Sequence, residues 1–322
     1  MSRIFYKPII VVSKCLGFEA CRYNGQMKND PFIDKLKHYV EIKTVCPEVS
    51  IGLGIPRESI RIVMEGENLK LMQPKTGINL YKSMNEFTEN FISNIDEVDG
   101  FILKSRSPSC GIKDVKVYSS VEKSANCIKG KGIFASSVLN KFPNLAIEDE
   151  GRLRDYKIRE HFLTKLYIMS EFREIKKSTS ISNVLQFHND NKLLLMSYNQ
   201  KELRILGRIL KDQQHFSLEE ILKKYEEHLS IALSKIPRYT SHINVLIRSI
   251  GYFSDKLTSK EKKFILDLIG KYRNGRVPLS TPLYVIKSYI VRFDEENLVN
   301  QTFFEPYPEE LVEVRDSGKN ID

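Results

Sequence analysis

Three cysteines have the chemistry and the surroundings to hold a metal cluster. Cys15, Cys46 and Cys110 each come shortly after a stretch that reads as a buried strand. None belongs to a CxxC pair, which disfavours a zinc ribbon or a thioredoxin-type motif. Thiolates favour soft metals and iron–sulfur clusters, and a cubane held by only three of them keeps one iron open to an outside ligand. The alternative is that these thiols are small buried hydrophobic side chains.

An open parallel sheet would bring these cysteines together. The strands that precede them are expected at residues 8–12, 39–45 and 100–104, and loops at the carboxyl ends of parallel strands gather in one crevice. Strand-like and helix-like segments alternate over residues 1–150, which is typical of a parallel α/β sheet. Further strands are expected at 60–64, 69–72 and 145–147, and helices at 30–38, 79–95 and 132–142.

After residue 150 the strand signals almost vanish. The pattern predicts a basic helix and linker over 151–180, an all-α domain over 181–314 and a polar tail over 315–322. The helices are expected at 152–172, 183–197, 200–210, 218–233, 243–253 and 260–272, with the linker at 176–182 and breaks at Pro278, Pro282, Pro306 and Pro308. The expected fold class is therefore an α/β parallel-sheet domain at 1–150 followed by an all-α helical domain.

Length and composition describe a globular chain of 322 residues, 41% hydrophobic and 28% charged. No apolar run approaches the ~18 residues that span a bilayer, and the first residues do not form a signal peptide. We therefore expect a cytoplasmic protein with no membrane partner, whose five reduced cysteines suit metal binding or catalysis better than disulfides. The net charge of +9 favours an anionic partner such as nucleic acid, and no protein partner is evident.

Short runs in both halves of the chain resemble known families. Residues 5–150 resemble the thiouracil desulfidases, once called domain of unknown function 523. The matching runs are Ser13-Lys-Cys-Leu-Gly-Phe, Cys21-Arg-Tyr-Asn-Gly25, Cys46-Pro-Glu48, Gly52-Leu-Gly-Ile-Pro-Arg57 and Lys104-Ser-Arg-Ser-Pro-Ser-Cys-Gly111. The second half resembles domain of unknown function 1722 in runs such as Leu206-Gly-Arg208, His242-Ile-Asn-Val-Leu246 and Pro306-Tyr-Pro-Glu-Glu-Leu311. The fusion is similar to the tRNA 4-thiouridine desulfidases.

The resemblance implies a cofactor and an activity. It implies that Cys15, Cys46 and Cys110 bind a [4Fe-4S] cluster whose fourth iron takes the thiocarbonyl sulfur of the substrate. The expected enzyme is thus an iron–sulfur-dependent desulfidase that converts 4-thiouridine in tRNA to uridine and hydrosulfide without any electron donor. One alternative is a desulfidase of free 2-thiouracil or of small thionucleosides, and another is a non-catalytic RNA-binding iron–sulfur protein.

The resemblance also implies catalytic roles for Glu48 and for a serine, with Ser107 preferred over Ser109. Glu48 would deprotonate a water that adds to the ring carbon, and the serine would relay a proton or hydrogen-bond the ring. Ser109 is assigned to substrate binding. The alternatives are a loop carboxylate that caps a helix or pairs with Arg57, and hydroxyls that bond only to a turn.

Four further residues are candidate substrate-binding groups. Arg22, Arg57 and Lys104 carry charges that suit phosphates, and Tyr23 could stack on a base. Surface charges and a half-buried ring are the alternative.

The two remaining cysteines are not expected to act on the substrate. Cys21 is either a structural thiol or a fourth ligand that would close the cluster, and Cys127 is expected to be a bystander.

Two basic stretches make tRNA the expected partner. One runs through Arg152, Arg154, Lys157, Arg159, Lys165, Arg173, Lys176 and Lys177, and the other through Lys201, Arg204, Arg208 and Lys211. Such stripes can follow a phosphate backbone, although they are more often solvated helix faces. His188 and His242, on expected helices, are interpreted as interhelical hydrogen-bonding residues.

Overall fold

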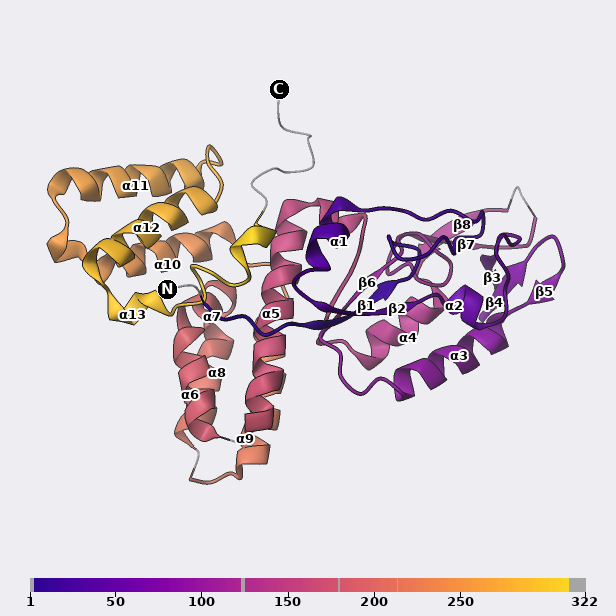
Figure 1. The fold of residues 1–322 in the computed structure, drawn as a ribbon, viewed down its shortest axis with the longest axis horizontal. Helices are drawn as coiled ribbons and strands as arrows, with labels where there is room; N and C mark the ends of the chain where they lie inside the picture. The colour runs from indigo at the N-terminus through magenta and orange to yellow at the C-terminus, as the bar shows by residue number, and fades with distance from the viewer. Residues whose placement is uncertain (1–2, 123–124, 179, 213, 313–322) are drawn as a thin grey trace. The chain divides into compact units, whose positions relative to one another are not determined.

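The computed structural model describes residues 3–122, 125–178, 180–212 and 214–312 (Figure 1). This part of the chain divides into two compact units. One unit is Lys7–Leu166, and the other begins at Tyr167 and also takes in the N-terminal residues up to Tyr6. The division falls inside helix α5 (Tyr156–Ser178), so the predicted segment 151–180 is shared between the units.

The first unit is built on a parallel sheet, as predicted. Its strands lie in the order β2 (Glu41–Val45), β1 (Ile9–Ser13), β6 (Gly100–Leu103) and β9 (Ala146–Asp149), all parallel. All residues of β1 and β6 are buried, which is usual for parallel strands with both faces covered. Strand order reverses at β1, because β2 lies on one side of it and β6 on the other. Ligands in such sheets bind at the carboxyl ends of the strands beside this reversal.

Helices cover this sheet. They are α1 (Pro31–Leu36), α2 (Pro47–Ser50), α3 (Tyr81–Ser93), α4 (Ile133–Lys141), the 3-10 turn η1 (Arg152–Arg154) and the first part of α5. Figure 1 shows α3 and α4 together below the sheet. Phe101 and Leu103 of β6 belong to the same core cluster as Met84 of α3 and Phe134 of α4.

A second, mixed sheet extends the first unit beyond the prediction. Its order is β5 (Ile78–Asn79), β4 (Asn68–Gln73), β3 (Arg61–Glu65), β7 (Val115–Tyr118) and β8 (Cys127–Gly130). Strands β3 and β4 confirm the segments expected at 60–64 and 69–72. The sequence pattern missed β5, β7 and β8. The helix expected at 79–95 begins only at Tyr81, and β8 has no buried residue and therefore no apolar alternation.

The second unit is all-α, as predicted. After α5 it contains α6 (Ile181–Asp190), α7 (Lys192–Tyr198), α8 (Gln200–Lys211), α9 (Leu218–Ala232), α10 (Tyr239–Gly251), η2 (Ser254–Lys256), α11 (Ser259–Arg273), α12 (Ser280–Phe293), α13 (Glu296–Val299) and η3 (Glu309–Leu311). Its core is a continuous cluster that includes Phe172, Phe187, Tyr225 and Phe253.

Three boundaries in this unit differ from the prediction. Helix α5 continues to Ser178 and α6 begins at Ile181, so most of the polar linker expected at 176–182 is helical. The helix expected at 183–197 is divided at Asn191, a buried residue whose amide donates to the Phe187 carbonyl and accepts from the Thr302 hydroxyl. Pro282 lies in the first turn of α12, where a missing N–H costs nothing, instead of breaking the helix.

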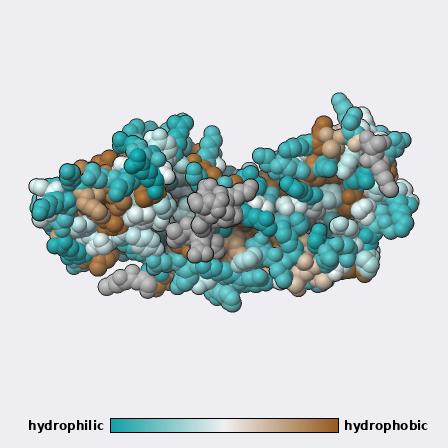
Figure 2. Space-filling model, turned by 90° about the horizontal axis from the view of Figure 1, so that it is seen from above, coloured by the Kyte–Doolittle hydropathy of each residue, from teal (hydrophilic) through white to brown (hydrophobic). Residues whose placement is uncertain are grey.

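The surface agrees with the charge pattern of the sequence. The face drawn in Figure 2 is largely hydrophilic, and its apolar residues lie in separate patches. No helix in the described part of the chain is both long enough and apolar enough to cross a membrane.

Candidate active site

A cavity of about 850 Å³ lies in the first unit, beside the carboxyl ends of its parallel strands. The loops that follow β1, β2, β6 and β9 all contribute to its walls. Its chemically versatile lining residues are Ser13, Cys15, Cys21, Arg22, Tyr23, Lys28, Cys46, Glu48, Arg57, Lys104, Arg106, Ser107, Cys110, Lys113, Asp149, Arg152 and Arg154. Except for Ser109, every predicted site residue lines this cavity.

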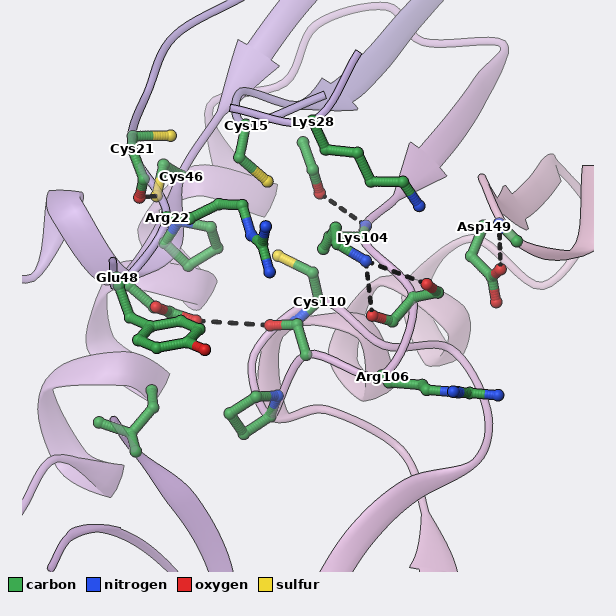
Figure 3. Close-up of a pocket in the computed structure, with 18 of the residues that line it drawn as sticks. Cys15, Cys21, Arg22, Lys28, Cys46, Glu48, Lys104, Arg106, Cys110 and Asp149 are labelled. Atoms are coloured by element: carbon green, nitrogen blue, oxygen red, sulfur yellow. Dashed lines mark hydrogen bonds between the residues drawn. The ribbon is translucent and has the colours of Figure 1, made fainter. Parts of the chain in front are cut away.

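The three predicted ligand cysteines meet here because their strands are neighbours. Cys15 follows β1, Cys46 is the residue before α2, and Cys110 lies in the loop between β6 and β7 (Val115–Tyr118). All three line the cavity, and Figure 3 shows the sulfurs of Cys15 and Cys110 pointing toward each other, with the sulfur of Cys46 turned toward the Cys21 carbonyl. Pro47 at the first position of α2 starts the helix at once after β2. The Cys46 thiol makes no cap hydrogen bond to this helix and contacts the Cys21 carbonyl instead.

Burial shapes the acidity of these thiols. Desolvation, and then the neighbouring Cys46, raises the pKa of Cys15 to about 11, and burial raises the pKa of Cys110 well above its usual value. The thiols of Cys15 and Cys110 are therefore neutral at pH 7 unless a positive charge compensates. Bound metal supplies such a charge and takes the thiolate form, with release of protons.

Cys21 lies against Cys46. Its carbonyl accepts a 3.9 Å contact from the Cys46 sulfur, the two side chains are hydrogen-bonded, and the Cys21 side chain is fully buried. Burial, with the charge of Cys46 next in size, raises the pKa of Cys21 to about 12. Cys110 is also buried and Cys21 also lines the cavity, so the structural role of Cys21 stays a prediction. Cys127, on exposed strand β8, lies outside the cavity.

The donor set consists of three thiols, the ligands that hold iron–sulfur clusters. Among the described residues, no group of three or more His, Cys, Asp or Glu side chains converges on one metal ion. In a cubane each cysteine binds a different iron, so the sulfurs need not converge on a point. Three thiol donors from separate loops fit this requirement, and soft sulfur donors match iron–sulfur chemistry.

Glu48 connects the cysteine loops to a serine turn. It lies in the first turn of α2, two residues after Cys46, and its side chain is 13% exposed. Its Oε1 accepts from the Ser109 hydroxyl at 3.0 Å and from the Ser107 hydroxyl at 3.4 Å. Its Oε2 accepts two bonds from the guanidinium of Arg57. The ion pair with Arg57 that the sequence left as an alternative is thus present, and Glu48 also lines the cavity.

The two serines have different surroundings. The oxygen of Ser107 accepts from the backbone N–H groups of Ser109 and Cys110, both at 3.1 Å, and Ser107 lines the cavity. The hydroxyl hydrogen of Ser107 points to Oε1 of Glu48, at an oxygen–oxygen distance of 3.4 Å. Ser109 is fully buried and is not a lining residue, so its contact is with Glu48.

A buried carboxylate that sequence reasoning missed organises one wall. Glu150, directly after β9, accepts from Lys28 at 2.8 Å and from Lys104 at 2.6 Å. It also accepts from the backbone N–H and the hydroxyl of Ser105. Burial raises its pKa, but the bonds and charges of Lys104 and Lys28 outweigh this and lower it to about 2. The position of Glu150 after a predicted strand, at the same edge of the sheet as the cysteine loops, is the signal that could have identified it.

The predicted cationic groups divide into paired and unpaired ones. Lys104 is paired with Glu150, and Arg57, only 5% exposed, is paired with Glu48. Arg22 lies over the ring of Tyr23, which is itself 48% exposed. Sequence reasoning missed Arg106 and Lys113. Within the described residues, Arg22, Arg106, Lys113 and Arg154 line the cavity without any ion-pair partner.

The helical unit carries one of the two predicted basic stripes. Lys201, Arg204, Arg208 and Lys211 are all exposed along one side of α8, at the spacing of a helix face. Arg204 also lines a cavity of about 470 Å³, together with Met196, Gln200, Leu203, Asn244, Ile247 and Arg248. The other predicted stretch is not a continuous surface, because Arg159 and Lys165 are buried.

The histidines of the helical unit have the expected structural contacts. His188 bonds to the hydroxyl of Tyr225 and His242 to that of Tyr272, both at 3.0 Å.

Comparison with known proteins matches both units. The model of the family described as 2-thiouracil desulfurase matches residues 10–150, and that of the family described as protein of unknown function (DUF1722) matches residues 192–308. The uncharacterized protein YbgA of Escherichia coli (strain K12) is 30% identical over 158 residues, which are 48% of this chain and 93% of that protein. The uncharacterized protein YbbK of Bacillus subtilis (strain 168) is 33% identical over 110 residues, which are 32% of this chain and 73% of that protein.

A solved structure of the [4Fe-4S]-dependent thiouracil desulfidase TudS aligns with a TM-score of 0.36 and 25% identity, over 46% of this chain and 93% of that chain. The two curated relatives are matched over most of their length. The chain therefore belongs to the 2-thiouracil desulfurase family through residues 10–150, and it carries a DUF1722 region over residues 192–308.

Proposed function

We propose that the chain is a [4Fe-4S]-dependent desulfidase that replaces the sulfur of 4-thiouridine in tRNA by oxygen and releases hydrosulfide. One observation carries the proposal: three thiols from neighbouring parallel strands share a cavity with Glu48 and Ser107. Membership of the 2-thiouracil desulfurase family supports the same chemistry.

The three thiols are the residues that would hold the cofactor. Cys15, Cys46 and Cys110 would hold the cluster, and Cys21 would remain a buried neighbour of Cys46. When bound, the cluster supplies an iron without a protein thiolate, a Lewis acid suited to the soft sulfur of a thiocarbonyl.

Glu48 and Ser107 then act on water and on the pyrimidine. Oε1 of Glu48 accepts a proton from the water whose oxygen attacks the ring carbon that carries sulfur. Ser107, whose oxygen is held by two backbone N–H groups, donates its hydroxyl to the ring or returns the proton. The carbon–sulfur bond breaks, a carbonyl replaces it, and hydrosulfide leaves. Water supplies the oxygen, so no electrons enter or leave.

The cations around the cavity favour a nucleotide over a bare base. Arg22, Arg106, Lys113 and Arg154 have no ion-pair partner among the described residues and line the cavity. Guanidinium groups bind phosphate through paired hydrogen bonds, and the exposed ring of Tyr23 offers a stacking surface.

The α8 stripe supports RNA as the polymer that carries this nucleotide. Its exposed basic residues could neutralise successive phosphates and thereby position the tRNA without reading its bases. A thiolated base in folded RNA must be exposed or extruded before its sulfur can be reached.

Anaerobic reconstitution with iron and sulfide, followed by incubation with thiolated tRNA, tests the proposal. We expect loss of the 4-thiouridine absorbance together with an equal amount of hydrosulfide. Glu48→Gln should abolish turnover while tRNA binding is retained. Parallel reactions with free 2-thiouracil and 4-thiouridine distinguish the small-molecule alternative. Sulfide release from none of these substrates would contradict the proposal and favour a non-catalytic RNA-binding protein.

A further inference from the structure

Arg57 makes more contacts around the cavity than a free substrate-binding cation would. Its Nε donates to Oε2 of Glu48 at 3.0 Å, and its Nη2 donates to the same oxygen. Its Nη1 donates to the carbonyl of Cys21 at 3.0 Å and, more weakly, to that of Gly54 at 3.4 Å. The Arg57 backbone N–H donates to the carbonyl of Tyr23 at 2.8 Å.

These bonds give the two oxygens of the Glu48 carboxylate different partners. Oε2 is held by two guanidinium nitrogens, whereas Oε1 faces the hydroxyls of Ser109 and Ser107. A carboxylate on a short helix such as α2 could otherwise rotate about its side-chain torsions. The planar guanidinium removes this freedom, because it binds Glu48 and the Cys21 carbonyl in one rigid plane.

The carbonyl of Cys21 also connects Arg57, and through it Glu48, to the cysteine loops. The Cys21 carbonyl receives both Nη1 of Arg57 and the contact from the Cys46 sulfur. Arg57 therefore fixes Glu48 relative to the loop that lies against Cys46. Lysine has a single ammonium and cannot span both positions with a fixed geometry.

We propose that Arg57 is a positioning residue of the desulfidase: it holds Oε2 of Glu48 so that Oε1 alone is presented to water, at a fixed place beside the Cys46 loop. The inference rests on the proposed function. It assigns Arg57 to the base and not to a substrate phosphate, which Arg22, Arg106 and Lys113 are free to bind.

Steady-state kinetics of Arg57→Lys on thiolated tRNA test this assignment. We expect kcat to fall about 100-fold, the scale of a small misplacement of a catalytic group, while KM and the iron content stay at the wild-type level. Free guanidinium should restore part of the kcat of Arg57→Ala. The matched control is Arg61→Lys, outside the cavity, whose guanidinium also donates to backbone carbonyls; it should keep full activity.

Other results would overturn the assignment. An unchanged kcat with a raised KM means that Arg57 binds substrate directly. A loss of iron that accounts for the whole loss of activity means that Arg57 only supports the ligand loop.

A second measurement keeps the test independent of turnover. Melting temperatures of Glu48→Gln, Arg57→Gln and the double variant form a thermodynamic cycle. If Arg57 holds Glu48, the double variant loses less than the sum of the two single losses. Additive losses of melting temperature would show that Arg57 does not hold Glu48, even in an active enzyme. A wild-type protein without activity on any thiolated substrate would refute the proposed function, and the cycle would still decide whether Arg57 holds Glu48.

Discussion

At the scale of single residues, the four buried or half-buried thiols are not equivalent. Cys15, Cys46 and Cys110 come from the ends of three neighbouring strands, whereas Cys21 lies against Cys46 and is fully buried. Three ligands keep one iron open, and a fourth would close it. The position of Cys21 therefore decides whether the proposed chemistry is possible.

Replacement of each cysteine by serine tests this division. We expect Cys15→Ser, Cys46→Ser and Cys110→Ser to lose most of the iron bound after anaerobic reconstitution, because each removes one cluster ligand. Cys21→Ser should keep the wild-type iron content and visible absorption spectrum, as should Cys127→Ser, the control on an exposed strand. Iron loss in Cys21→Ser equal to that in Cys46→Ser would identify a fourth ligand.

The Glu150 carboxylate predicts a pH-dependent stability. Its pKa in the folded chain is about 2, below its ordinary value of 4.5. A depressed pKa contributes stability that is complete above pH 4.5 and is lost as the pH falls toward 2. Glu150→Gln leaves Lys28 and Lys104 without their buried partner and should cost about 3 kcal/mol at pH 7.

Urea unfolding of wild type and Glu150→Gln between pH 7 and pH 3 measures this effect. The difference between the two midpoints should narrow as the pH falls below about 4.5. A difference that stays constant over this range would mean that the charge of Glu150 does not stabilise the fold. Lys82→Gln, which removes a fully exposed partner of Glu86, should change little at any pH.

Sequence reasoning reached the ligands at this scale but not the groups that hold them. The cysteines, Glu48 and Ser107 occur in short, ordered runs, and all of them line the cavity. The bond between Arg57 and Glu48 appeared only as an alternative, because a sequence does not give side-chain direction. Glu150 was missed because its partners, Lys28 and Lys104, are 122 and 46 positions away.

At the scale of elements, the N-terminus of α4 holds the serine loop. The backbone N–H groups of Ile133 and Ala135 donate to the carbonyls of Pro108 and Ser109, both at 3.0 Å. Gly132 donates to the Gly111 carbonyl at 2.7 Å. The loop thus satisfies the free N–H groups that every helix start exposes. The position of Ser107 and Cys110 therefore depends on the helix that the sequence predicted at 132–142, for which the sequence suggested no role at the site.

Gly132→Ala should disturb the site from outside the cavity. A Cβ at this position would come within 2.4 Å of the Ser109 carbonyl oxygen and 2.9 Å of the Gly111 nitrogen, so the loop must move. We expect kcat to fall roughly 10- to 100-fold with the helical content unchanged, because the loop carries Ser107 and Ser109. Gly251→Ala, whose Cβ meets no atom within 4 Å, is the control. Wild-type kcat in Gly132→Ala would show that the loop tolerates the shift.

The buried strands β1 and β6 could be anticipated at this scale, and strands β7 and β8 of the second sheet could not. Strands β1 and β6 are continuous apolar runs, and such runs mark strands that are buried on both faces. Strand β7 has its two buried residues, Val115 and Val117, within only four positions, and β8 has no buried residue. Both owe their structure to pairing with a neighbour, β7 with β3 and β8 with β7. Such pairing leaves little trace in the local pattern.

At the scale of the whole molecule, the chain contains one unit with the cysteine-lined cavity and one helical unit with a basic stripe on α8. Lys201, Arg204, Arg208 and Lys211 are exposed on α8, and no described acidic residue pairs with them. Each phosphate that such a side chain neutralises releases a counterion, so binding weakens with salt. If the helical unit binds tRNA, the stripe should contribute a measurable part of this salt dependence.

The double variant Arg204→Glu/Arg208→Glu should weaken tRNA binding. It should also reduce the slope of the logarithm of the tRNA association constant against the logarithm of the salt concentration by about 2, one for each lost phosphate contact. Lys260→Glu/Lys263→Glu on α11 changes the net charge by the same amount at exposed positions. It should lower affinity only through long-range charge and leave the slope nearly unchanged. Desulfurisation of free 4-thiouridine should be equal in both variants, because the cavity lies in the other unit. Equal slopes for the two variants would mean that α8 does not touch the phosphates, and that the tRNA is held by the cations of the cavity alone.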